Sequence, residues 1–133
     1  MKIALILNRD AGTLRTLDVT AVSEELAGIF RAEGHNATPV VTAGEDAVAV
    51  IRKAAIAEET DAIVVGGGDG TISSAAAISA ESGVPLGILP LGTMNFFARS
   101  LGIPAEMKAA AVALVSQELP LGTTMGSWVG RFS

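Results

Sequence analysis

The chain has 133 residues, half of them hydrophobic, with no cysteine and a formal net charge of -5. This length suits one packed domain, and a composition rich in Ala, Val, Ile and Leu excludes a disordered chain. The lack of cysteine excludes disulfides and thiolate chemistry, and the scattered basic residues argue against nucleic acid as a partner.

Nothing in the sequence predicts a membrane-spanning or secreted segment. No stretch approaches the roughly 18–20 apolar residues that a membrane-spanning helix requires. The opening MKIALILNRD has a short apolar run before Asn8, too short for a signal peptide. We therefore expect a cytoplasmic protein.

The first half of the chain alternates between strand and helix patterns. Residues 2–7 (KIALIL) form an apolar run that predicts a buried strand, and residues 37–42 predict a second strand. Between them, residues 17–33 predict an amphipathic helix that Gly34 ends. The apolar positions of this helix recur at spacings of three and four: Val19, Val22, Leu26, Ile29 and Phe30.

Residues 45–59 predict a second helix. We expect its inner face to consist of Ala47, Val48, Ile51 and Ala55. Glu58 and Glu59 near its end oppose the helix macrodipole, so we expect that end to fray.

The second half continues the alternation. It predicts strands over 61–65 and 85–89, helices over 71–82 and 104–117, and a further short strand over 118–121. Strands that alternate with helices at this spacing indicate right-handed βαβ units, and hence an α/β fold around a parallel sheet.

A glycine-rich turn follows the third predicted strand, in VVGGGDGTISSA (residues 64–75). Ligands of parallel sheets bind beyond the carboxyl ends of the strands, where Asn8, Thr42, residues 66–71 and residues 91–95 should converge. Glycines there let phosphate oxygens approach backbone N–H groups at a helix N-terminus, and the Thr71 hydroxyl is a further donor. Each such charge-assisted bond contributes roughly 1.5–3 kcal/mol.

Asp69 is the unusual residue of this turn, because a bare carboxylate repels phosphate. A Mg²⁺ between the two, bound directly or through water, would explain it. The turn matches neither GxxxxGK[ST] nor G-x-G-x-x-G, since no lysine follows the glycines and Thr71 occupies the final glycine position. Close helix–strand packing is the alternative explanation of the glycines, although a second Gly-Thr step at Gly92 argues against it.

Two segments together resemble the nucleotide-binding domain of the diacylglycerol kinase-like lipid kinases, a family that includes sphingosine and ceramide kinases. GGGDGT at 66–71 is moderately specific, whereas its pairing with PLGTMNFFARSLGIP at 90–104 is highly specific. Residues 6–13 and 40–47 resemble the family's N-P-x-[SA]-G segment and its threonine-containing turn. The resemblance implies a three-layer α/β/α domain over residues 1–120 with a mainly parallel sheet, as in the related NAD kinases.

The resemblance also implies ATP and Mg²⁺ as cofactors, and transfer of the ATP γ-phosphoryl group to a lipid hydroxyl in phospholipid metabolism. Asp69 matches the acidic residue essential to the family, so we expect it to serve catalysis and to hold the metal, directly or through water. The residues that match the ATP site are Asn8, Thr42, Gly67, Gly68, Asp69, Gly70, Thr71, Ile72, Ser73, Gly92, Thr93 and Asn95.

Three positions depart from the family pattern. Arg9 stands where the family usually has proline, Ser74 where glutamate is common, and Phe96 where many members have aspartate. The predicted site therefore keeps Asp69 but is poor in other carboxylates. We interpret Asp10 as a solvated loop residue rather than as part of the site.

Family members carry a second, β-sandwich domain that closes over the site and supplies further acidic residues. We expect residues 121–133 to be the crossover toward such a domain, and the present chain to bind nucleotide without phosphorylating lipid by itself. Because the implied acceptor is a lipid, contact with a membrane surface stays an open alternative. Homodimerisation also stays open, through an unpaired strand edge or through Trp128, where the second domain should pack.

Two other functions are weighed against the lipid kinase. An NAD kinase shares the GGDGT region but typically carries an Asn-Glu pair that this chain lacks. A non-catalytic, nucleotide-binding or regulatory relative would explain Phe96 and Ser74. Continuation of the gene into a β-rich domain with acidic residues would favour the enzyme.

Overall fold

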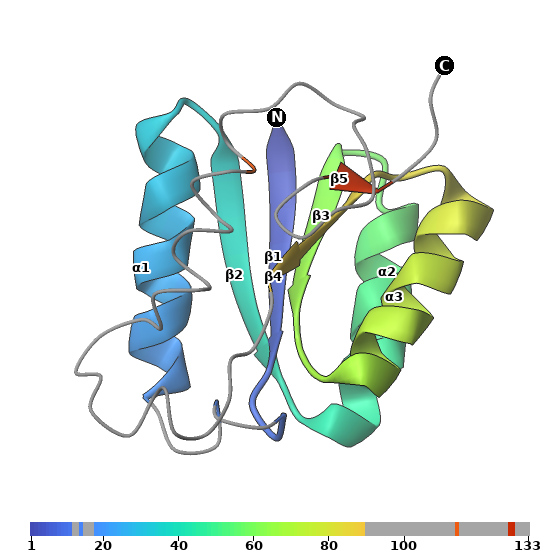
Figure 1. Ribbon diagram of the computed structural model, residues 1–133. Helices are drawn as coiled ribbons and strands as arrows, with labels where there is room; N and C mark the ends of the chain where they lie inside the picture. The colour runs from blue at the N-terminus through green and yellow to red at the C-terminus, as the bar shows by residue number, and fades with distance from the viewer. Residues whose placement is uncertain (12–13, 15–17, 90–113, 115–127, 130–133) are drawn as a thin grey trace.

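The computed structural model describes residues 1–11, 14, 18–89, 114 and 128–129. Within these ranges, a sheet of strand order β2-β1-β3-β4-β5 stands between helices on both faces (Figure 1). The first four strands run parallel, and the short β5 is antiparallel to β4. The predicted three-layer α/β fold with a mainly parallel sheet is therefore confirmed.

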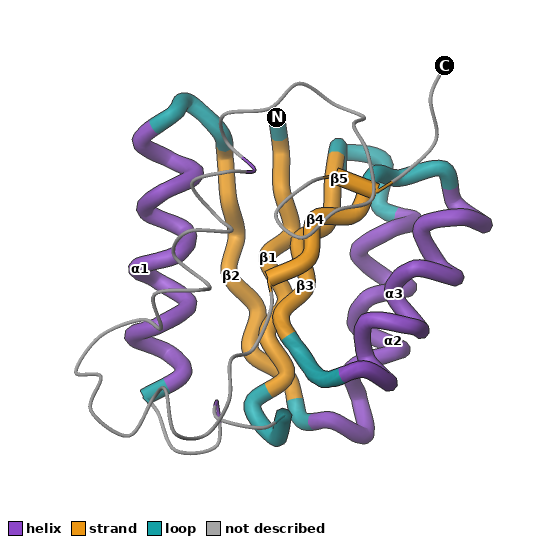
Figure 2. Tube along the Cα trace, viewed as in Figure 1, coloured by secondary structure: helices purple, strands orange, loops and turns teal. Residues whose placement is uncertain are grey.

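The elements follow one another along the chain as Figure 2 shows, with helices and strands in alternation. Their bounds are β1 Lys2–Asn8, α1 Val19–Ala32, β2 Asn36–Thr42, the 3₁₀ turn η2 Gly44–Asp46, α2 Ala47–Ile56, β3 Ala62–Gly66, α3 Asp69–Ser82, β4 Leu86–Leu89 and β5 Trp128–Val129.

The sheet buries apolar side chains on both faces, because successive residues of a strand point to opposite sides. In β1, Ile3, Leu5 and Leu7 pack toward α1, with Leu26 and Phe30 of that helix. On the opposite face, a second core joins β1 and β3 to α2 and α3; its buried members are Ile6, Ile51, Ala55, Ile63, Val65, Ala75, Ile78 and Leu86. Burial on both faces explains why the central strands read as continuous apolar runs.

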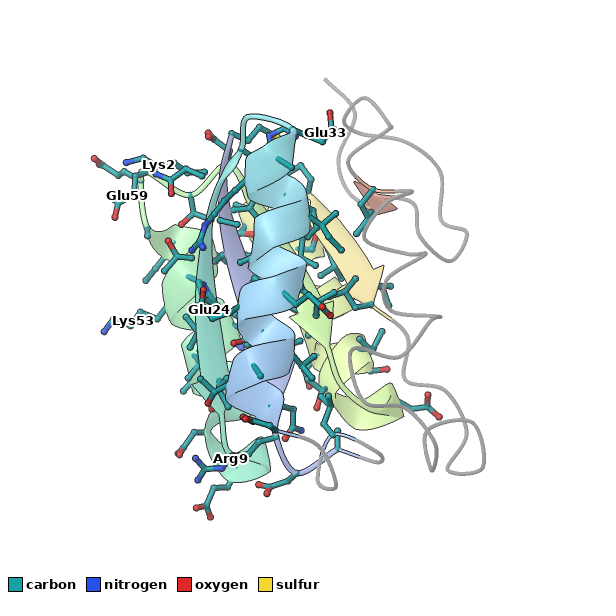
Figure 3. All side chains as sticks on the ribbon, turned by 90° about the vertical axis from the view of Figure 1, so that its left-hand side faces the viewer. Lys2, Arg9, Glu24, Glu33, Lys53 and Glu59 are labelled. Carbon is teal, nitrogen blue, oxygen red and sulfur yellow. The ribbon has the colours of Figure 1, made fainter. Side chains whose placement is uncertain are left out.

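Helix α1 forms as the sequence predicts. The Asp18 carboxylate caps its N-terminus by accepting from the N–H of Ala21 at 3.2 Å. Gly34 follows its C-terminus with φ of 87°, a left-handed conformation that glycine adopts without strain. Glu24, which Figure 3 labels on this helix, pairs with Arg31 at 3.4 Å.

Helix α2 is shorter than predicted, and one inner-face assignment is wrong. The helix ends at Ile56 rather than at Glu59, with Ala57 in an extended conformation. Glu58 and Glu59 thus lie outside the helix, as expected of carboxylates that would oppose its macrodipole. Ala47, Ile51 and Ala55 are buried, but Val48 is 41% exposed.

The predicted helix over 104–117 and strand over 118–121 fall outside the described residues, except for Leu114. The side chain of Leu114 is buried in the core beneath α1. None of the helices in the described ranges combines the length and the apolar character needed to cross a bilayer.

Candidate functional site

The strand order puts a topological switch point, which we call the crevice, at the carboxyl ends of β1 and β3. Helix α1 covers one face of the sheet and α2 and α3 cover the other (Figure 1), so the chain leaves β1 over one face and returns to β3 over the opposite one. A reversal of this kind separates the loops that follow the two strands and makes room for a ligand. The register sets these loops level, since Leu7 pairs with Gly66 and Asn8 with Thr42.

The turn from β3 into α3 is tighter than the sequence predicts. Strand β3 ends at Gly66 and α3 begins at Asp69, so Gly67 and Gly68 alone connect them. The predicted start at Thr71 was two residues late, because Gly68 acts as the N-cap in an extended conformation. Asp69 therefore belongs to the first helical turn, where a carboxylate is favoured by the macrodipole.

The glycines of the turn serve two different purposes. A Cβ on Gly67 would lie 2.8 Å from Cβ of Thr71, so this glycine is required by packing. A Cβ on Gly68 or Gly70 would meet nothing within 4 Å. Among the described residues, positive φ occurs only at Gly34 and Gly83, so the backbone conformation does not require Gly68 or Gly70 either.

The open space at Gly68 and Gly70 lies over the N-terminus of α3. No side chain caps this helix, so the first-turn N–H groups have no capping acceptor in the described part of the chain. Asp69 and Gly70 are exposed and Gly68 is half-buried. Open glycines over uncapped N–H groups provide the environment in which helix N-termini bind anions.

Asn8 joins the end of β1 to the first turn of α3. Its Nδ2 donates to Oγ1 of Thr71 at 3.0 Å, and its Oδ1 accepts from the N–H of Asp10 at 2.9 Å. The side chain is only 7% exposed. A buried amide whose two ends are both bonded is held in one orientation, so Asn8 fixes Thr71 relative to the sheet.

Asp10 and Gly44 extend the same network to the loop after β2. The N–H of Gly44 donates to Oδ2 of Asp10 at 2.8 Å, and a Cβ on Gly44 would lie 3.4 Å from the Asn8 amide. Asp10 is exposed in the loop after β1, as its interpretation as a solvated loop residue requires, and its carboxylate also ties that loop to the one after β2. The Asn-x-Asp spacing, typical of side chains that bond to nearby backbone, was the signal available in the sequence.

Thr42 ends β2 beside an open surface pocket. The threonine is 5% exposed, and its hydroxyl donates to the carbonyl of Ala43 at 3.0 Å. The pocket has a volume of about 440 Å³. Arg9 stands at this edge of the sheet, whereas Lys2 and Glu59 mark the opposite edge (Figure 3). The lining residues are Arg9, Val41, Thr42, Ala43, Asp46, Ala49, Val50 and Lys53.

Most of the described candidate residues meet at this one edge: Asn8, Thr42, Gly67, Gly68, Asp69, Gly70 and Thr71. Ile72 differs, because its side chain packs against the core beneath α2 and α3 and its N–H donates to the carbonyl of Gly68 at 3.0 Å. Ser73 is exposed on the helix. Gly92, Thr93 and Asn95 lie outside the described residues.

The donor set limits what metal the site could hold. In the part of the chain that the structure describes, no three His, Asp or Glu side chains come together to ligate a cation. Asp69 in the first turn of the uncapped helix nevertheless offers carboxylate oxygens. A Mg²⁺ fits there if phosphate and water supply its remaining oxygens, which is how that ion is usually bound.

Fold and site together define an α/β domain with an uncapped, glycine-rich turn at its topological switch point. The family model for the diacylglycerol kinase catalytic domain matches residues 2–125 of the sequence. The chain therefore belongs to the diacylglycerol kinase catalytic-domain family, which confirms the resemblance read from the two glycine-containing segments.

Individual proteins agree with this assignment. The chain is 40% identical over 101 residues to the protein named "Probable lipid kinase YegS-like" of Klebsiella pneumoniae (strain 342), which covers 73% of this chain and 34% of that protein. It is 47% identical over 62 residues to a diacylglycerol kinase of Mycobacterium tuberculosis, covering 47% of this chain and 20% of that protein.

A solved structure is similar as well. The crystal structure of a diacylglycerol kinase from Bacillus anthracis superposes with a TM-score of 0.58 and 32% identity, covering 86% of this chain and 43% of that chain. The chain thus spans less than half the length of these relatives.

Proposed function

We propose that the chain is the ATP-binding part of a lipid kinase, which transfers the γ-phosphoryl group of ATP to a lipid hydroxyl. The observation that carries the proposal is the uncapped N-terminus of α3, left open at Gly68 and Gly70 and tied to β1 through Thr71. Phosphate oxygens would accept from the first-turn N–H groups there, in a site of positive helix potential. Family membership supports a kinase rather than another phosphate-binding protein.

The nucleotide would extend from this turn across the end of β1 toward Thr42. Asn8 and Thr42 are paired in register, and Thr42 lines the pocket. Its mixed lining offers apolar surface from Val50 and charge from Arg9 and Lys53. A pocket of this composition suits the base and ribose of a nucleotide, with few polar groups to fix their orientation.

Asp69 is the residue that we assign to the metal and to phosphoryl transfer. It is exposed in the first turn of α3, beside the N–H groups that would hold the phosphates. When bound, Mg²⁺ neutralises charge that develops on the transferring phosphoryl group. Asp69 would orient that ion, while Thr71 and the backbone N–H groups orient the phosphate oxygens.

The acceptor hydroxyl would belong to the lipid, and the base that deprotonates it would come from outside the described residues. We therefore propose that this chain binds Mg·ATP but transfers no phosphoryl group by itself, and that the complete kinase works in the cytoplasm with its lipid at a membrane surface. A non-catalytic nucleotide-binding relative is the second candidate. The observation that favours it is the lack of a carboxylate cluster around Asp69 in the described part of the chain.

Calorimetric titration tests the binding step. Mg·ATP and NAD are each titrated into the chain, beside Asp69→Asn and a control, Glu58→Gln, which removes the same charge from an exposed site outside α2. We expect Mg·ATP to bind, NAD to fail, and Asp69→Asn alone to lose the dependence on Mg²⁺. Equal Mg²⁺ dependence in both variants would refute the role of Asp69, and NAD binding would refute the lipid kinase.

A further inference from the structure

The orientation of the Asn8 amide is settled by its neighbour. The backbone N–H of Asp10 is a donor and nothing else, and it lies 2.9 Å from one end of the Asn8 side chain. That end must be the oxygen. The amide nitrogen therefore faces Thr71, 3.0 Å away, and donates to the threonine hydroxyl.

This assignment determines the direction of the Thr71 proton. A hydroxyl has one proton and two lone pairs. Since Asn8 occupies a lone pair, the proton of Thr71 must point elsewhere, and the structure shows no acceptor for it among the described residues. Thr71 lies in the first turn of α3, so the crevice is where an acceptor would lie.

The side chain of Thr71 is also prevented from turning away. It packs against Gly67, where a built Cβ would lie 2.9 Å from Cγ2 and 3.2 Å from Oγ1. Rotation about χ1 would exchange methyl and hydroxyl and break the bond from Asn8. The hydrogen bond from Asn8 thus selects the rotamer of Thr71.

We propose that Asn8 is a positioning residue, which makes Thr71 a donor to bound phosphate by occupying the acceptor side of its hydroxyl. The inference rests on the proposed nucleotide function and adds a role that differs from direct contact with the ligand. In this relay, the N–H of Asp10 fixes the orientation of the Asn8 amide, the amide fixes the direction of the Thr71 hydroxyl proton, and the hydroxyl donates to phosphate. Asn8 therefore acts only through Thr71.

Replacement of Asn8 by aspartate reverses the relay with little change in shape. A carboxylate accepts from Asp10 as before but also accepts from Thr71, so it draws the hydroxyl proton away from the crevice. Because this change adds a negative charge, the informative variant is Asn8→Asp with Asp10→Asn, which keeps the net charge of the parent. Asparagine at position 10 retains an oxygen for the N–H of Gly44.

Binding of Mg·ATP and of magnesium tripolyphosphate is measured by calorimetry for the parent and the variants. The charge-balanced double variant should bind either ligand about 10- to 100-fold more weakly, the effect of losing one charge-assisted hydrogen bond. Thr71→Val should weaken binding by a similar factor. Adding the charge-balanced pair, Asn8→Asp with Asp10→Asn, to Thr71→Val should then change binding little, because the relay is already broken.

One further variant keeps the test decisive. Asn8→Ala removes the amide without offering an acceptor, so it should weaken binding less than the charge-balanced variant does, and it serves in the cycle if that variant fails to fold. Unchanged binding in the charge-balanced variant, or effects at Asn8 and Thr71 that multiply, would overturn the relay. Tripolyphosphate binding without ATP binding would refute the proposed function alone, whereas a parent that binds neither ligand would overturn both.

Discussion

Replacement of Gly70 by alanine should make the protein more stable and a weaker nucleotide binder. Gly70 lies in the first turn of α3, at negative φ, and a Cβ there would meet nothing within 4 Å. Alanine restricts the unfolded chain without straining the fold, so the free energy of unfolding should rise by about 0.4–1 kcal/mol. Thermal denaturation followed by circular dichroism measures this gain.

The same methyl group should interfere with the ligand. It would project into the space over the uncapped N–H groups of α3, where phosphate oxygens must come within hydrogen-bond distance. Loss of one such charge-assisted bond costs roughly 1.5–3 kcal/mol, or about 10- to 100-fold in the dissociation constant of Mg·ATP. Calorimetric titration of the folded variant measures that constant.

Gly28 offers a matched control for this substitution. It lies in the middle of α1, is exposed, and also has nothing within 4 Å of a built Cβ. Gly28→Ala should therefore raise stability by a similar amount and leave Mg·ATP binding unchanged. If Gly70→Ala binds Mg·ATP as the parent does, the open glycines do not make room for phosphate, and the reasoning fails.

Three other outcomes are expected. Gly67→Ala should lower the free energy of unfolding by about 1–3 kcal/mol in a urea titration, because its Cβ would clash with Cβ of Thr71 at 2.8 Å; a stability equal to the parent's would contradict the packing role. Asp10→Ala should cost about 1 kcal/mol by removing the acceptor of the Gly44 N–H, whereas Asp10→Asn should cost less. In a radiolabel assay with ATP and diacylglycerol vesicles, the 133-residue chain should form no phosphorylated lipid, and robust turnover would refute its dependence on further residues.

The sheet and its helices could be predicted because local patterns and tertiary packing agree. Val22, Leu26 and Phe30 are spaced for one helix face, and all three are buried against the sheet. Val48 shows the limit of this reasoning. Its spacing allows an inner position, but Ile51 and Ala55 are the residues of α2 buried in the second core, and Val48 is 41% exposed.

The members of the site could be predicted more readily than their connections. Strand ends place Asn8 and Thr42 at one edge, and that placement follows from any parallel sheet. The bond from Asn8 to Thr71 joins residues 63 positions apart, which no local pattern encodes. The start of α3 was also misplaced, because an extended glycine as N-cap leaves no side-chain signal in the sequence.

Strands β1, β2 and β3 end at the same level of the sheet. This sets a minimum length for any ligand that contacts both Thr42 and Gly66. Thr42 and Gly66 terminate strands that lie on either side of β1, and neighbouring strands are about 4.8 Å apart, so such a ligand must span about 10 Å. A single phosphate is too short to bridge them. The strand spacing would then select ligands by length, so Thr42→Ala should weaken the binding of ATP and leave the binding of pyrophosphate unchanged.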